Sequence, residues 1–125
     1  MRAPALLTAV ALAGCSGSPP PVTAAALAGS AWVETCDGAD DGRARVAQVR
    51  LDPDGLFGYI LEAPPASDWE KDGTDSWSLD GTVLTLSWTS GFAVSAYDLA
   101  GYAGGRVEGS TSKGCAGGTF LERAP

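Results

Sequence analysis

The side chains that could do chemistry in this chain of 125 residues are three cysteines and 15 carboxylates, because histidine is absent. Without imidazole, the chain lacks the base of Ser-His-Asp and Cys-His catalysis and a common ligand of zinc. Two carboxylates such as Glu62 and Glu70 could exchange protons with a substrate, but no motif brings them together. We therefore expect a protein that is not an enzyme and that holds neither a metal nor a cofactor.

Residues 37–42, DGADDG, hold three carboxylates, and carboxylate oxygens are ligands that Ca²⁺ prefers. The segment lacks the spacing and the bidentate glutamate of an EF-hand, so we expect an acidic loop in solvent. The net charge of −7 argues against nucleic acid as a partner, because phosphates are bound by clustered Lys and Arg.

The first cysteine follows a segment that is typical of an export signal. Arg2 precedes an apolar run over residues 3–13. As a helix this run would rise about 16 Å, roughly half of the hydrocarbon core of a bilayer, so it is too short to span one. The run leads into Leu12-Ala13-Gly14-Cys15, which resembles the lipobox of bacterial lipoproteins at all four positions.

That resemblance implies a signal peptide over residues 1–14, cut before the cysteine, and fatty acyl chains such as palmitate on Cys15. It also implies a protein of the cell envelope that is anchored in a membrane by its lipid. Ser16, and not aspartate, follows the cysteine. In lipoproteins this implies the periplasmic face of the outer membrane when the host has two membranes.

Residues 16–22, SGSPPPV, are typical of a semi-rigid tether, because proline and small polar residues cannot join a packed core. Residues 23–28 either continue this tether or form a short helix at its end. We assign residues 15–28 to the acylated cysteine and the tether, and residues 29–125 to one domain of ordinary length.

Two cysteines, Cys36 and Cys115, remain once Cys15 carries lipid. An oxidising envelope favours a disulfide between them. The alternatives are two separate buried thiols or a metal pair, for which the chain offers no further soft ligand. A bridge would close a loop of about 80 residues and stabilise the fold by about 4 kcal/mol through the entropy of the unfolded chain.

From Gly29 onward the sequence alternates polar and apolar side chains, which predicts half-buried strands, and no segment sustains helical periodicity. Seventeen glycines and eight prolines favour short strands joined by tight turns. The predicted strands span residues 30–36, 44–52, 56–62, 74–79, 82–89, 92–99, 102–110 and 117–123.

Three turns predict how neighbouring strands pair. Residues 53–55 suit a three-residue loop, Asp80-Gly81 a two-residue turn, and residues 89–91 another three-residue turn. The predicted opposite pairs are Leu51 with Phe57, Leu79 with Thr82, Trp77 with Leu84, Trp88 with Phe92, and Leu86 with Val94.

A Cys36–Cys115 bridge would join the first strand to the last, and these are neighbours in a meander only when it closes. We therefore favour an all-β fold, a small antiparallel up-and-down barrel of about eight strands, over the alternative of a sandwich. Residues 27–32 (LAGSAW), 54–57 (DGLF) and 77–86 (WSLDGTVLTL) resemble the lipocalin-like (calycin) barrels of small bacterial lipoproteins.

The calycin resemblance implies a lumen that binds a small apolar molecule, or a barrel that serves as a scaffold. An eight-stranded barrel is wide enough to be filled by side chains or to hold one small ligand. The side chains predicted to line or fill the lumen are Trp32, Phe57, Tyr59, Trp77, Leu84, Leu86, Trp88 and Phe92.

The alternative function is protein binding. Residues 77–84 (WSLDGTVL) are similar to a hairpin of the small lipoprotein lysozyme inhibitors, and an acidic domain would attract a basic enzyme. Asp68, Trp69 and Glu70 lie on the longest connection between strands, where Trp69 could contact a partner or fold over the open end of the barrel.

Overall fold

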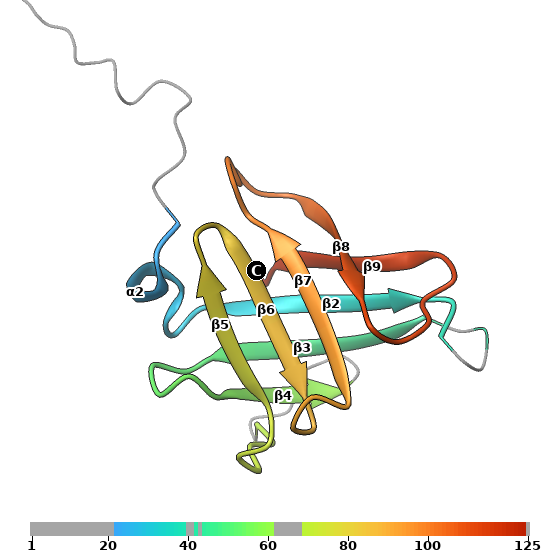
Figure 1. Cartoon of the computed structure of the whole chain (residues 1–125), viewed down its shortest axis with the longest axis horizontal. Coiled ribbons are helices and arrows are strands. Elements are labelled where there is room, and N and C mark those ends of the chain that lie inside the picture. Colours follow the sequence, from blue (N-terminus) through green and yellow to red (C-terminus); the bar gives the residue numbers. More distant parts are fainter. Residues whose placement is uncertain (1–21, 40–41, 43, 62–68, 125) are drawn as a thin grey trace, which may run out of the picture.

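A computed structural model of the chain describes residues 22–39, 42, 44–61 and 69–124. These residues form eight antiparallel strands and one helix of four residues (Figure 1), which confirms the predicted all-β class. The elements are α2 (Ala24–Leu27), β2 (Ala31–Asp37), β3 (Arg45–Leu51), β4 (Phe57–Leu61), β5 (Ser76–Asp80), β6 (Val83–Trp88), β7 (Ala93–Asp98), β8 (Arg106–Thr111) and β9 (Gly118–Arg123).

The strands form one sheet in the order β4-β3-β2-β9-β8-β7-β6-β5. The first strand along the chain, β2, therefore pairs with the last, β9. This pairing extends from Trp32 opposite Arg123 to Asp37 opposite Gly118. In Figure 1, β5, β6 and β7 pass across β2, β3 and β4, because the twisted sheet rolls onto itself. The result is a nearly closed meander barrel, as the sequence predicts.

The predicted disulfide between Cys36 and Cys115 is present, with the two Cα atoms 5.3 Å apart across a sequence separation of 79. Cys36 lies near the end of β2, and Cys115 lies three residues before β9. The bridge therefore fixes one end of the β2–β9 pair.

The free edges of the sheet are β4 and β5, and short backbone contacts join them. The Phe57 amide donates to the Asp75 carbonyl (3.0 Å), and the Trp77 amide donates to the Gly55 carbonyl (2.9 Å). Farther along β4, Tyr59 and Glu70 exchange two hydrogen bonds of 2.9 Å each. The weakest pairing of the barrel thus lies between its third and fourth strands, where the connection is longest.

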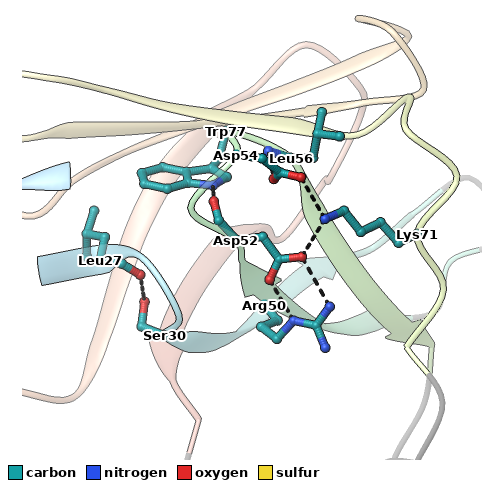
Figure 2. A network of polar contacts seen from close by, with 8 residues as sticks. All are labelled: Leu27, Ser30, Arg50, Asp52, Asp54, Leu56, Lys71 and Trp77. Carbon is teal, nitrogen blue, oxygen red and sulfur yellow. Dashed lines mark hydrogen bonds and ion pairs between the residues drawn. The ribbon is translucent and has the colours of Figure 1, made fainter. Parts of the chain in front are cut away.

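A cluster of charges holds the same seam from outside (Figure 2). Asp52 accepts from the Arg50 guanidinium (Nε to Oδ1, 2.7 Å) and from the Lys71 ammonium (Nζ to Oδ2, 2.8 Å). Lys71 also pairs with Asp54 at 2.9 Å, and the Trp77 indole donates to the Asp52 carbonyl at 2.8 Å. The turn after β3 is thereby tied both to the long connection and to β5.

The end of the barrel at which β2 begins is packed solid. Leu27 of α2 is buried there beside Trp32, so residues 23–28 take the helical alternative. The Ser30 hydroxyl donates to the Leu27 carbonyl (Figure 2) and accepts from the Trp32 indole at 2.8 Å. Inward residues from β3, β4, β6, β7 and β9, together with the residue that follows β7, complete this core, namely Val49, Leu51, Phe57, Leu84, Leu86, Tyr97, Leu99 and Leu121.

Two of the three predicted turns differ from the structure in register. The loop at residues 53–55 is confirmed, because Leu51 lies opposite Phe57. In the β5–β6 hairpin, however, Trp77 lies opposite Leu86 and not Leu84, since residues 81–82 form the turn. A shift of two residues keeps every side chain on its predicted face.

The β6–β7 hairpin is shifted by one residue, and this reverses β7. Trp88 lies opposite Ala93, and Ser95 and Tyr97 point inward in place of the predicted Val94. Phe92 lies in the turn and is 67% exposed, so it is not a core side chain. The turn takes four residues, since its first two amides bond to other parts of the chain.

Candidate functional site

A cavity of about 390 Å³ opens at the end of the barrel that carries the disulfide. Its size is within the range of ligand sites, about 300–1,000 Å³. The inner faces of the strands carry small residues at this end, among them Ala47, Ala93, Ser95 and Thr119. Large side chains fill the other end, so the barrel is packed in one half and hollow in the other.

Three residues with exposed hydrophobic side chains border this cavity: Leu61 and Phe92, and Val46, which lies on the outer face of β3 beside the inward Ala47. They are 63%, 67% and 38% exposed, in that order, and they are the exposed large hydrophobic residues of the described part of the chain. We call them the apolar rim. Exposed hydrophobic side chains that gather in one place usually mark a binding surface.

A buried carboxylate, Glu34, lines the cavity from β2 and is 8% exposed. The Trp88 indole donates to Glu34 Oε1 at 2.9 Å, and the Tyr97 hydroxyl donates to Glu34 Oε2. The Tyr97 oxygen lies 2.7 Å from the hydroxyl of Thr119. We call these four residues the polar floor; its groups come from β2, β6, β7 and β9.

The electrostatics of the polar floor favour a neutral phenol at Tyr97. Burial raises the pKa of Tyr97 well above its usual range, and the nearby Glu34 charge raises it further. Tyr97 therefore keeps its proton and remains a donor. None of the ion pairs found among the described residues includes Glu34.

Two cationic side chains lie near the mouth of the cavity. Arg45 and Lys113 line the cavity but are exposed, and the Lys113 ammonium lies 4.0 Å from the centre of the Phe92 ring. An ammonium over an aromatic face is attracted by the electrons of the ring, which holds both side chains at the rim.

The side chains predicted for the lumen are distributed between the core and the cavity. Trp32, Phe57, Leu84 and Leu86 are at most 1% exposed and belong to the packed half. Tyr59, Trp77 and Trp88 are partly buried against that core. Of the predicted set, Trp88 lines the cavity wall and Phe92 lines its mouth.

The predicted partner loop lies only partly within the described residues, since Asp68 falls outside them, as do Glu62 and Cys15. Trp69 is half-buried beneath Arg50, whose guanidinium lies 5.1 Å from the centre of its ring. Arg50 points away from the core, so Trp69 packs on the outer wall and not over the open end. The Glu70 backbone pairs with Tyr59 in the seam.

The polar floor was missed by the sequence analysis, although one signal for it exists. Glu34 is two residues after Trp32 on a strand, and side chains two apart share a face. An inward Trp32 therefore implies an inward carboxylate. Tyr97 and Thr119 carry no comparable signal, because the predicted register placed Tyr97 on the outside.

Comparison with known proteins finds no relative of this chain: no protein family, curated protein or solved structure matches it. Within the described ranges, no three His, Cys, Asp or Glu side chains come together as a metal site requires. No helix of that same part is long and apolar enough to cross a membrane. The functional argument therefore depends on the barrel itself.

Proposed function

We propose that this protein is a lipid-anchored envelope lipoprotein whose lipocalin-like barrel binds a small, largely apolar molecule without converting it. The observation behind this proposal is the cavity of about 390 Å³ with its apolar rim. A ligand that enters would cover Leu61 and Phe92 of this rim, and the removal of apolar surface from water would favour binding.

The placement of the cavity agrees with such an anchor. The described chain begins beside α2, at the packed end, whereas the cavity lies at the far end of β2 (Figure 1). Seven residues of strand separate these ends by about 23 Å. A protein held through lipid on Cys15 would thus be attached at the end opposite its binding site.

The expected intact mass of the mature protein is that of a chain beginning at Cys15 with acyl chains attached.

Ligand binding can be tested with N-phenyl-1-naphthylamine, a neutral apolar probe that fluoresces when water is excluded. We expect saturable binding to the wild-type barrel and energy transfer from Trp88, which lines the cavity. Ala93→Phe places a ring in the cavity and should abolish binding. Ala100→Phe adds the same ring to an exposed turn after β7 and should bind normally. Binding that is absent in the wild type, or unchanged in Ala93→Phe, would reject the proposal.

A further inference from the structure

Glu34 gives the cavity a chemical preference that its apolar walls do not. Glu34 as a residue is only 8% exposed, and the described residues offer its carboxylate hydrogen-bond donors but no cation in ion-pair contact. A carboxylate has about four lone-pair directions, so the two donors Trp88 and Tyr97 leave acceptor capacity unused. A buried charge is costly unless a counter-charge accompanies it.

We propose that the cavity binds a ligand with a protonated amine on an apolar body, with the amine on Glu34 and the body between Trp88 and the apolar rim. This inference rests on the proposed function and specifies its ligand class. Glu34 lies at the floor and the hydrophobic side chains lie at the mouth, so the amine enters first.

Three features of the site agree with this orientation. An ammonium group at the floor supplies the positive counter-charge for which Glu34 has no source among the described residues, through a charge-assisted hydrogen bond. Trp88, whose indole already bonds Glu34, offers an aromatic wall that attracts cations. Arg45 and Lys113 at the mouth disfavour an amine in the outer half and leave the floor as its place.

The test compares two probes of equal length, hexylamine and 1-hexanol, as competitors for bound N-phenyl-1-naphthylamine at neutral pH. In the wild type, hexylamine should displace the probe at about tenfold lower concentration than 1-hexanol, the effect of one hydrogen bond to a charged group. Glu34→Gln should remove this preference. Glu122→Gln, which neutralises an exposed glutamate on β9, is the matched control and should keep it.

Glutamine can keep the fold, since its carbonyl accepts from Trp88 and its amide can donate to Tyr97. If Glu34→Gln nevertheless fails to fold, the wild type alone decides by NMR. At equal occupancy, hexylamine should shift the indole N–H resonance of Trp88 further than 1-hexanol does, because the amine shares Glu34 with this indole. The indole N–H of Trp77, bonded to the Asp52 carbonyl, should not move.

The outcomes separate the two proposals. Equal displacement by both competitors, with no selective shift at Trp88, overturns the amine inference and leaves apolar binding standing. A preference that persists in Glu34→Gln also overturns it, because the amine is then held elsewhere. A wild type that does not bind the neutral probe at all rejects the proposed function.

Discussion

Tyr97 connects the packed half of the barrel to the cavity, because its ring belongs to the core and its hydroxyl belongs to the polar floor. The side chain is fully buried, and its hydroxyl contacts Glu34 and Thr119. A buried polar atom that loses its partner costs about 1–3 kcal/mol, whereas an exposed one finds water. The floor therefore acts as a unit in which each group depends on the others.

Tyr97→Phe should lower the free energy of unfolding by about 1–3 kcal/mol, because it leaves Glu34 Oε2 without its donor. Tyr102→Phe is the control. It removes a hydroxyl that donates to the Gly105 carbonyl (2.8 Å) and accepts from the Arg123 amide (3.2 Å); both contacts are exposed, so water can replace them and the cost should be less than about 1 kcal/mol. Urea denaturation measures both. Equal losses would show that the floor does not stabilise the fold.

Gly109 in β8 lets the Tyr97 ring approach the backbone. A Cβ built on Gly109 would overlap the Ala96 carbonyl and the Tyr97 ring. Gly109→Ala should therefore destabilise the protein by about 1–3 kcal/mol, as overpacking of a core does, and should weaken binding in the cavity. Gly114→Ala, with open space around its Cβ, is the comparison and should be nearly neutral in thermal unfolding. A fully stable Gly109→Ala protein would contradict this packing.

The seam between β4 and β5 is stabilised by the ion pairs of Asp52 as well as by backbone pairing. The Arg50 guanidinium, hydrogen-bonded to Asp52, holds the pKa of that carboxyl below its usual value, and Lys71 adds to the effect. A carboxyl with a lowered folded pKa stabilises the protein above its unfolded pKa of about 4. That stability disappears as the pH falls through the folded value.

Asp52→Asn should cost about 1 kcal/mol at pH 7, and the difference from the wild type should shrink below about pH 4. Denaturant titrations at pH 7, 4 and 2.5 follow this change. Asp80→Asn is the control, because it alters an exposed carboxylate at the end of β5 that takes part in none of the ion pairs of the described residues. A deficit of Asp52→Asn that grows on acidification would contradict the assigned ion pairs.

The disulfide joins β2 to the start of β9, which already pair through their backbones. Replacing both Cys36 and Cys115 by alanine should lower stability by about 4 kcal/mol through the entropy of the unfolded chain, without loss of the fold. Circular dichroism and urea denaturation of the double variant measure this effect. A chain that no longer forms strands would show that the bridge, and not the pairing, closes the barrel.

Local signals predicted the strands, and the two cysteines predicted the closure, but of the three predicted turns only the loop at residues 53–55 gave the correct register. Residues 53–55 contain a proline and a glycine that determine their loop, and this register is correct. The turn after β6 is instead shaped by distant contacts. The Thr89 amide donates to the Asp75 carboxylate and the Ser90 amide to the Thr74 carbonyl, with positive φ at Thr89 and Ser90. These two partners are distant in sequence, so the residues of the turn alone do not predict its register.

The site was less predictable than the fold for the same reason. The lumen followed from alternation, but its division into a solid and a hollow half depends on which small residues meet at one end. Ala47, Ala93 and Thr119 become neighbours only through the closure of the barrel. The inward position of Glu34 can be predicted from its spacing to Trp32. The position of its donor Tyr97 depends on the register of β7, which the local sequence does not determine.

The molecule as a whole carries a net negative charge and, in our proposal, a lipid anchor. The charge and the anchor have opposite effects on binding to a membrane. The net charge is −7, and removal of Arg2 with the proposed signal peptide would leave 7 basic and 15 acidic side chains, a net charge of −8. An anionic bilayer repels such a domain. Acyl chains on Cys15 would therefore be the sole attraction, at about 0.8 kcal/mol for each buried CH₂ group.

Membrane association should accordingly resist salt. We expect the native protein to stay in the membrane fraction in about 1 M salt, which screens charges beyond roughly 3 Å and would release a protein held by ion pairs. Cys15→Ser should move to the soluble fraction at every salt concentration. The double variant Cys36→Ala/Cys115→Ala loses two cysteines but keeps Cys15, and it should remain with the membrane. Fractionation followed by immunoblotting decides the matter, because release of the native protein by salt, or retention of Cys15→Ser, would assign the anchor to charge or to another segment.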